Sequence, residues 1–204
     1  MKLSHEIAQD LLAIKAVQIR PEHYFTWTSG IKAPIYCDNR LTMSHPAVRN
    51  RIAKGFVQLI EQMPEKPDVI AGCATAGIPH AAWVAEKLDL PMVYVRSKPK
   101  AHGKGNQIEG TFEKGARVIV IEDLLSTGGS SLQAAKALEN NGAIVLGVLA
   151  IFSYGLEKLV TQFKEADLPY ETLTNYDELL QLLMDNQTID NDQYQALKAW
   201  RHTL

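Results

Sequence analysis

The stretch that decides the fold is residues 118–131, which read VIVIEDLLSTGGSS. Its first four residues are apolar and β-branched, as is typical of a parallel strand buried on both faces. Two carboxylates follow, Glu122 and Asp123, and then a turn of small and hydroxyl-bearing residues at 126–130. After the turn, apolar residues recur at helical spacing as far as Asn140. The order predicts a strand, a turn and a helix.

This turn has the composition of a phosphate site. Backbone N–H groups converge in a turn rich in Gly, Ser and Thr, and the N-terminus of a following helix adds a favourable partial charge. Glu122 and Asp123 would repel a phosphate, but they suit the hydroxyls of a sugar beside it. No Lys follows the last Gly, and G-x-G-x-x-G is absent, which excludes a Walker loop and a dinucleotide fingerprint. The stretch predicts a ribose 5-phosphate cradle, although composition alone leaves an ordinary turn with solvated carboxylates equally open.

Length and composition fit one domain, residues 1–204. A formal net charge of −2 gives no reason to expect nucleic acid or an anionic membrane as a partner. Cys37 and Cys73 match no metal spacing, so we expect buried, reduced thiols. The N-terminal segment does not resemble a signal peptide, and the longest apolar stretch, 144–152, is too short to span a bilayer. We therefore expect a soluble cytoplasmic protein.

Predicted strands and helices alternate along the chain with short connections, which favours an α/β fold with a mostly parallel sheet. We also expect an antiparallel pair between residues 109–112 and 117–121, around a turn at 113–115. The expected strands are 17–19, 35–37, 68–73, 91–95, 117–121, 143–152 and 170–173.

A second strand–turn–helix unit surrounds Ala74-Thr75-Ala76-Gly77. The same reasoning makes it a candidate anion site, although taken alone it is more often an ordinary turn.

A basic loop follows the predicted strand at 91–95. Arg96, Lys98, Lys100 and Lys104 stand within nine residues, together with His102. Two glycines and a proline argue against a folded core position. The loop is either a solvated basic segment or a mobile cationic lid over residues 96–110. We favour the lid, which would neutralise a leaving diphosphate, because the loop leaves the carboxyl end of a strand.

Residues 23–40 (HYFTWTSGIKAPIYCDNR) are turn-rich, aromatic and basic. They predict either a hairpin over one edge of the core or a hood over a flat ligand. In the second case Phe25, Trp27 and Tyr36 would stack on the ligand, and Ser29-Gly30 would offer backbone donors.

The order of strand, Glu-Asp, two leucines and Ser-Thr-Gly-Gly-Ser resembles the phosphoribosyl-diphosphate (PRPP) motif of the type I phosphoribosyltransferases. Together with the hood FTWTSGIKAPIYCDNR (25–40) and the lid RSKPKAHGKG (96–105), it resembles bacterial orotate phosphoribosyltransferases. That resemblance implies a central, mostly parallel sheet flanked by helices, a small N-terminal hood from roughly residues 1–40 and a mobile basic lid. The implied reaction transfers the phosphoribosyl group of PRPP to orotate, giving orotidine 5′-phosphate and diphosphate in de novo pyrimidine synthesis.

The resemblance also implies roles for single residues. Lys100 and His102 would be catalytic, on a lid that reaches the neighbouring subunit of a homodimer. Ser126 would also contact orotate, Ala74-Thr75-Ala76-Gly77 would hold the diphosphate, and Mg²⁺ would be bound through PRPP with no direct protein ligand. The residues implied to bind PRPP are Arg96, Lys100, His102, Glu122, Asp123, Leu124, Leu125, Ser126, Thr127, Gly128, Gly129 and Ser130.

Two departures from that family concern orotate. Some members carry a Lys where this chain has Thr28, and some place an Arg where this chain has Phe152-Ser153-Tyr154. Lys32 or backbone amides of the hood would then meet the orotate carboxylate.

Two other functions stay open. The nearer is a purine or salvage phosphoribosyltransferase with the same cradle. The other is a non-catalytic PRPP-sensing regulator, but a near-neutral chain of 204 residues leaves no room for a DNA-binding module or a strong basic patch. The intact lid also favours an enzyme, because a sensor has no leaving group to stabilise.

Overall fold

The computed structural model describes residues 2–26, 30, 32–98 and 107–203. Its centre is a six-stranded sheet in the order β10-β9-β8-β5-β6-β7. Neighbouring strands are parallel except for the edge pair β6 and β7. The predicted α/β fold with a mostly parallel sheet is confirmed. The strands are β5 (Val69–Cys73), β6 (Met92–Val95), β7 (Ile108–Glu109), β8 (Arg117–Leu125), β9 (Ile144–Ser153) and β10 (Tyr170–Asn175).

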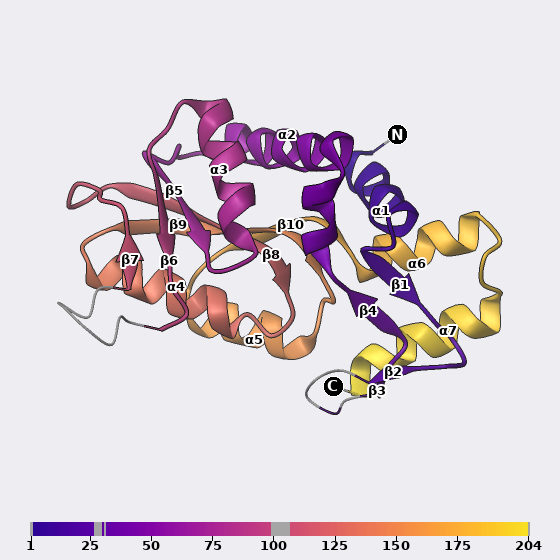
Figure 1. Ribbon diagram of the computed structural model, residues 1–204. Coiled ribbons are helices and arrows are strands. Elements are labelled where there is room, and N and C mark those ends of the chain that lie inside the picture. The colour runs from indigo at the N-terminus through magenta and orange to yellow at the C-terminus, as the bar shows by residue number, and fades with distance from the viewer. Residues whose placement is uncertain (1, 27–29, 31, 99–106, 204) are drawn as a thin grey trace.

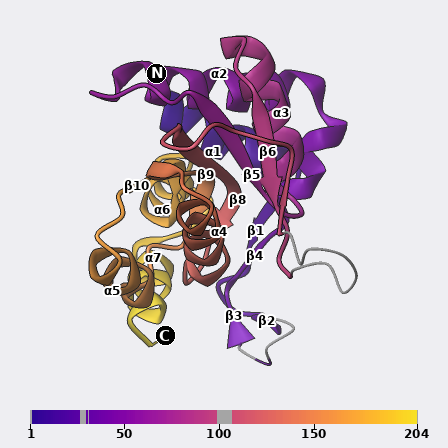
Figure 2. The ribbon, with the colours of Figure 1, turned by 90° about the vertical axis from the view of Figure 1, so that its left-hand side faces the viewer.

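Helices cover both faces of the sheet (Figures 1 and 2). One face packs against α2 (Pro46–Gln62) and α3 (Gly77–Leu88), and the other against α4 (Gly129–Asn140) and α5 (Glu157–Glu165). Within the residues described, no helix combines the length and apolar character that crossing a bilayer requires.

The central strand β8 faces both cores at once. Ile119 and Ile121 belong to the core under α2 and α3, whereas Val118 and Val120 belong to the core over α4 and α5. All four side chains are fully buried, as the apolar run predicted. The strand also continues to Leu125, four residues beyond the predicted end, because it stays paired with β9 there. The two carboxylates therefore lie within the strand, on opposite faces of the sheet.

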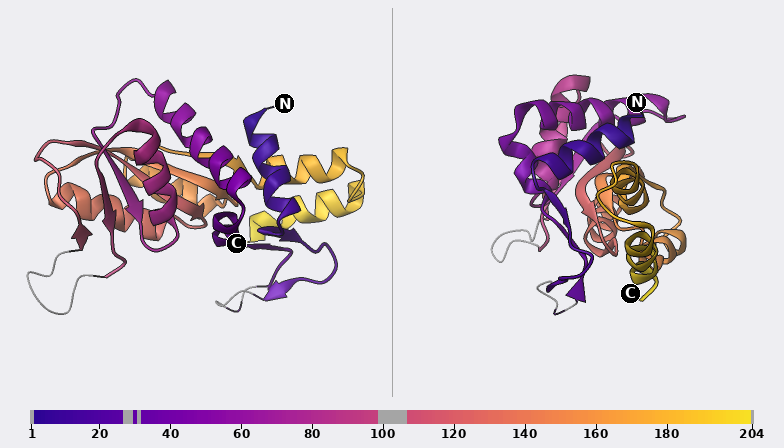
Figure 3. Two further views of the ribbon diagram at one scale, coloured as in Figure 1. Left: turned by 45° about the horizontal axis from the view of Figure 1, so that its top comes forward. Right: turned by 90° about the vertical axis from the view of Figure 1, so that its right-hand side faces the viewer.

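A second part of the molecule lies at the β10 edge of the sheet (Figures 1 and 3). Here α1 packs against α6 and β10, and the indole Nε1 of Trp200 donates to the carbonyl oxygen of Lys32 at 3.3 Å. The C-terminal helices thus support the N-terminal hood segment. The elements are α1 (Leu3–Ala13), β1 (Val17–Ile19), β2 (Phe25–Thr26), β3 (Lys32–Ala33), β4 (Ile35–Cys37), the 3₁₀ helix η1 (Asn39–Ser44), α6 (Tyr176–Asp185), α7 (Asn191–Trp200) and the 3₁₀ helix η2 (Arg201–Thr203).

The predicted antiparallel pair between residues 109–112 and 117–121 is wrong. Residues Ile108–Glu109 form β7, which pairs with β6 instead. The reason is that β8 has β5 on one side and β9 on the other, so neither of its edges is free for a hairpin partner.

The connections between strands create one crevice. The chain leaves β5 through α3 to β6 on one side, and it leaves β8 through α4 toward β9 on the other. In open α/β sheets, ligands bind where the connections of adjacent strands diverge, outside their carboxyl ends. The loops at 74–76 and 126–128 both lie at this point, so the fold places the two predicted anion loops side by side.

Candidate functional site

The turn after β8 is built as an anion site. Gly128 has a φ of +85° and serves as the N-cap of α4, where a side chain would strike Phe163 and Leu159 of α5. A Cβ at Gly129, the first helical residue, would meet nothing within 4 Å. The N–H groups of a first helical turn have no partner inside the helix. The turn therefore presents a helix N-terminus, with Ser126 and Thr127 beside it, and the 5-phosphate site predicted there stays a prediction.

Glu122 joins the turn to the sheet. Its side chain is only 6% exposed, and its carboxylate oxygens accept from the Asp123 N–H at 3.0 Å and from Ser130 Oγ at 3.4 Å. The Cys73 thiol at the end of β5 lies close to this carboxylate. Burial, followed by repulsion from Asp123, raises the pKa of Glu122 above its ordinary value. The structure thus fixes Glu122 between β5, β8 and α4.

Asp123 points to the other face of β8, into a pocket of about 630 Å³. Its own pKa is raised, mainly by burial. A half-buried carboxylate at the mouth of a crevice is suited to bind sugar hydroxyls. The residues that line the pocket come from the hood segment, the loop after β5, α3 and β8: Cys37, Asp38, Arg40, Met43, Thr75, Ala76, Pro79 and Asp123.

The predicted diphosphate loop lies against this pocket. Thr75 and Ala76 line it, and the Ala74 N–H is held by the Val95 carbonyl oxygen at 2.9 Å. At Gly77 a Cβ would collide with the Ile121 carbonyl oxygen, so only glycine lets α3 start directly on β8. The loop and Asp123 are therefore neighbours, as expected if one ligand contacts both.

The described ends of the predicted lid are tied together. The Arg96 N–H donates to the Gln107 carbonyl oxygen at 2.9 Å, and the Arg96 guanidinium lies 3.3 Å from Glu109. Arg96 also lines a small cavity of about 30 Å³ together with Ala74 and Ser130. One predicted lid residue is thus brought to both anion loops. Lys100 and His102 lie outside the described residues, so their roles stay predictions.

The residues considered for orotate are scattered. Lys32 is exposed on β3 and is not among the residues that line the pocket, so its role stays a prediction. Ser153 and Tyr154 are only 3% and 4% exposed. Burial raises the pKa of the Tyr154 hydroxyl, which therefore stays uncharged. Phe25 and Tyr36 lie together, with ring centroids 5.8 Å apart, whereas Trp27 and Thr28 fall outside the described residues.

Sequence reasoning missed the turn that follows β4. Asn39 is buried, and its Nδ2 donates to the Asp123 carbonyl oxygen at 2.6 Å. Arg40 and Asp38, on either side of it, line the pocket and form an ion pair at 2.6 Å. The available signal was the run Asp-Asn-Arg directly after a predicted strand, because such residues favour a turn whose side chains bond locally.

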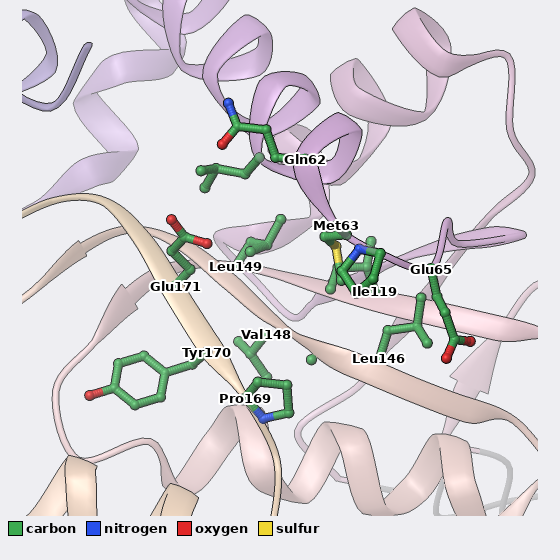
Figure 4. Close-up of a pocket in the computed structure, with 13 residues that line it drawn as sticks. Gln62, Met63, Glu65, Ile119, Leu146, Val148, Leu149, Pro169, Tyr170 and Glu171 are labelled. Atoms are coloured by element: carbon green, nitrogen blue, oxygen red, sulfur yellow. The ribbon is translucent and has the colours of Figure 1, made fainter. Parts of the chain in front are cut away.

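A second pocket, of about 540 Å³, lies at the opposite ends of the strands from the crevice (Figure 4). Its residues belong to the end of α2 and the beginnings of β9 and β10, among them Met63, Leu146, Val148 and Tyr170. It is mainly apolar and lies at the amino-terminal ends of those strands, away from both anion loops. The functional site is therefore the crevice beside Asp123.

Known proteins share this architecture and sequence. The phosphoribosyl transferase domain family matches residues 43–178. An orotate phosphoribosyltransferase from Oceanobacillus iheyensis is 56% identical over 202 residues, which cover 99% of this chain and all of that protein. The chain belongs to the orotate phosphoribosyltransferase family.

Other members of the family agree over nearly the full length. An orotate phosphoribosyltransferase from Fusobacterium nucleatum is 57% identical over 204 residues, covering 99% of this chain and 97% of that one. The crystal structure of an orotate phosphoribosyltransferase from Aeropyrum pernix superposes with a TM-score of 0.77 at 26% identity, over 90% of this chain and 99% of the other. The type I phosphoribosyltransferase fold that the sequence implied is thereby confirmed.

Proposed function

We propose that the protein is an orotate phosphoribosyltransferase, which transfers the 5-phosphoribosyl group of PRPP to orotate and releases diphosphate. The observation that carries this proposal is the crevice at the ends of β5 and β8. It joins a helix N-terminus, the Asp123 carboxylate and a second small-residue loop, with Glu122 buried behind the turn. The near full-length similarity to orotate phosphoribosyltransferases supports orotate over other bases.

The chain's own residues supply binding and electrostatics. The first turn of α4 holds the 5-phosphate through backbone N–H groups, with the hydroxyls of Ser126 and Thr127. Asp123 and Glu122 fix the ribose hydroxyls and face the positive charge that develops at C1 during displacement. The lid, with Lys100 and His102, covers the departing diphosphate and stabilises its charge. The protein needs no nucleophile for this reaction.

We further propose Mg²⁺ as the cofactor, bound mainly through oxygens of PRPP. The carboxylates at the site suit a hard cation that keeps most of its ligands from substrate and water. Among the described residues, no group of three or more His, Cys, Asp or Glu side chains offers an all-protein metal site. When bound, Mg²⁺ would neutralise charge on the diphosphate.

A homodimer that shares its lids, and a cytoplasmic location, complete the proposal. Arg96, at the described start of the lid, lines the small cavity beside both anion loops of its own subunit, and we propose that Lys100 and His102 serve the site of a facing subunit. Both cysteines are free thiols, which fits a reducing compartment. Sedimentation tests the dimer, and a fully active monomer would contradict it.

The function is tested by following the ultraviolet absorbance of orotate with purified protein, PRPP and Mg²⁺. Parallel reactions contain uracil, adenine, guanine or hypoxanthine. We expect the orotate band to disappear only when both PRPP and Mg²⁺ are present. Consumption of a purine instead would favour a salvage enzyme, and PRPP binding without turnover of any base would favour a sensor.

A further inference from the structure

The pocket beside Asp123 is lined by a positively charged side chain, that of Arg40, for which the sequence predicted no role. Three charged residues line it, and among those Arg40 carries the positive charge. The other two, Asp38 and Asp123, are carboxylates. Both substrates proposed above are anions, so carboxylates alone would repel them. The pocket needs a positive group to accept either substrate.

The guanidinium of Arg40 is held in one orientation. Its Nε donates to Asp38 Oδ1 at 2.6 Å and its Nη2 donates to Asp38 Oδ2 at 2.8 Å. A bidentate pair of this kind fixes the plane of the guanidinium but uses only two of its five N–H groups. The side chain remains 63% exposed, so the other N–H groups are accessible to a ligand.

The turn that carries Arg40 is itself fixed to β8. The Asn39 side chain is 1% exposed and donates to the Asp123 carbonyl oxygen at 2.6 Å. Thr42 Oγ1 donates to the Asn39 carbonyl oxygen at 2.5 Å and lies 3.4 Å from the buried ring of His80 on α3. Residue 40 is therefore positioned relative to Asp123 by the hydrogen bond from the Asn39 side chain to the main chain of β8 and by the contact of Thr42 with His80 on α3.

We propose that Arg40 binds an oxyanion of the bound substrate in this pocket, either the carboxylate of orotate or a diphosphate oxygen of PRPP. The proposal rests on the proposed function, because it takes its two ligands from that reaction. It also assigns a role to the one positively charged side chain among the described residues that line this pocket. Both candidate groups are oxyanions that a guanidinium can bind through hydrogen bonds. Binding measurements with ligands that carry only one of the two groups distinguish them.

The test compares three ligands that share the ribose 5-phosphate. Ribose 5-phosphate has neither extra anion, PRPP adds the diphosphate, and orotidine 5′-phosphate adds the carboxylate of the base. Their dissociation constants are measured by calorimetry on the wild type and on Arg40→Met. We expect the variant to bind ribose 5-phosphate as the wild type does, and to lose about tenfold or more in affinity for one of the other two. Loss for PRPP identifies the diphosphate, and loss for orotidine 5′-phosphate identifies the carboxylate.

Arg117→Met is the matched control. Arg117 makes the same bidentate pair, with Nε 3.0 Å and Nη2 2.6 Å from the Asp68 carboxylate, but at the start of β8 and far from the pocket. We expect it to leave all three affinities unchanged. Unchanged affinities in Arg40→Met, or an equal loss for all three ligands, would overturn the proposal. These measurements need no turnover, so a failure of orotate consumption would refute the proposed function separately.

Discussion

Replacing Gly128 by Ala tests whether the turn after β8 depends on its backbone geometry. Gly128 has a φ of +85°, and a conformation of this kind costs a residue with a Cβ about 1–2 kcal/mol. The new Cβ would also stand 2.5 Å from Phe163 Cε2 and 2.8 Å from Leu159 Cδ1, and overpacking of this kind costs about 1–3 kcal/mol. We therefore expect the free energy of unfolding to fall by roughly 2–5 kcal/mol.

The assay is urea denaturation followed by circular dichroism, where a lower midpoint with an unchanged slope reports lost stability. At a melting transition the same loss corresponds to a decrease of roughly 4–20 °C for a chain of this size. Gly129→Ala is the control, because its Cβ meets nothing within 4 Å and its φ is not positive. The control should stay within about 0.5 kcal/mol of the wild type. Equal stabilities for Gly128→Ala and the control would refute the reasoning.

Three further predictions follow from the site. Gly77→Ala should prevent stable folding, because its Cβ would collide with the Ile121 carbonyl oxygen; a normal yield of protein with wild-type circular dichroism would contradict this. Glu122→Gln should gain stability relative to the wild type as pH rises from about 4.5 to about 8. In this range the raised pKa keeps the Glu122 carboxyl protonated in the folded wild type while it ionises in the unfolded chain, so ionisation favours unfolding of the wild type alone. Urea midpoints at pH 5 and pH 8 measure the difference, and equal shifts at both would refute it. Lys100→Ala should lower kcat at least tenfold with little change in the urea midpoint, and full activity would exclude the lid role.

The central unit was predictable because its signals are local. A run of β-branched residues, two carboxylates and a glycine-rich turn stand next to one another in the sequence, and each determines its own backbone conformation. The end of the strand was misplaced because the pairing that extends β8 to Leu125 is made with β9, a separate segment. Strict alternation along a longer strand would have placed Glu122 and Asp123 on opposite faces.

The part of the site that was missed is determined by tertiary contacts. Asn39 and Asp123 are 84 residues apart in the chain, and their hydrogen bond forms only when the hood segment packs on β8. The misassigned hairpin has a similar cause, because β8 is surrounded by parallel neighbours that its own sequence does not specify. Local patterns predicted the phosphate turn, whereas the pocket beside it depends on which distant segment covers it.

The most direct test of the central claim is a phosphorus NMR spectrum of protein, PRPP, Mg²⁺ and orotate, recorded as the reaction proceeds. If the crevice beside Asp123 transfers the phosphoribosyl group, free diphosphate and a new phosphomonoester will appear in equal amounts, each matching the orotate consumed. Unchanged PRPP signals in the presence of orotate, or diphosphate released at the same rate without orotate, would contradict the account.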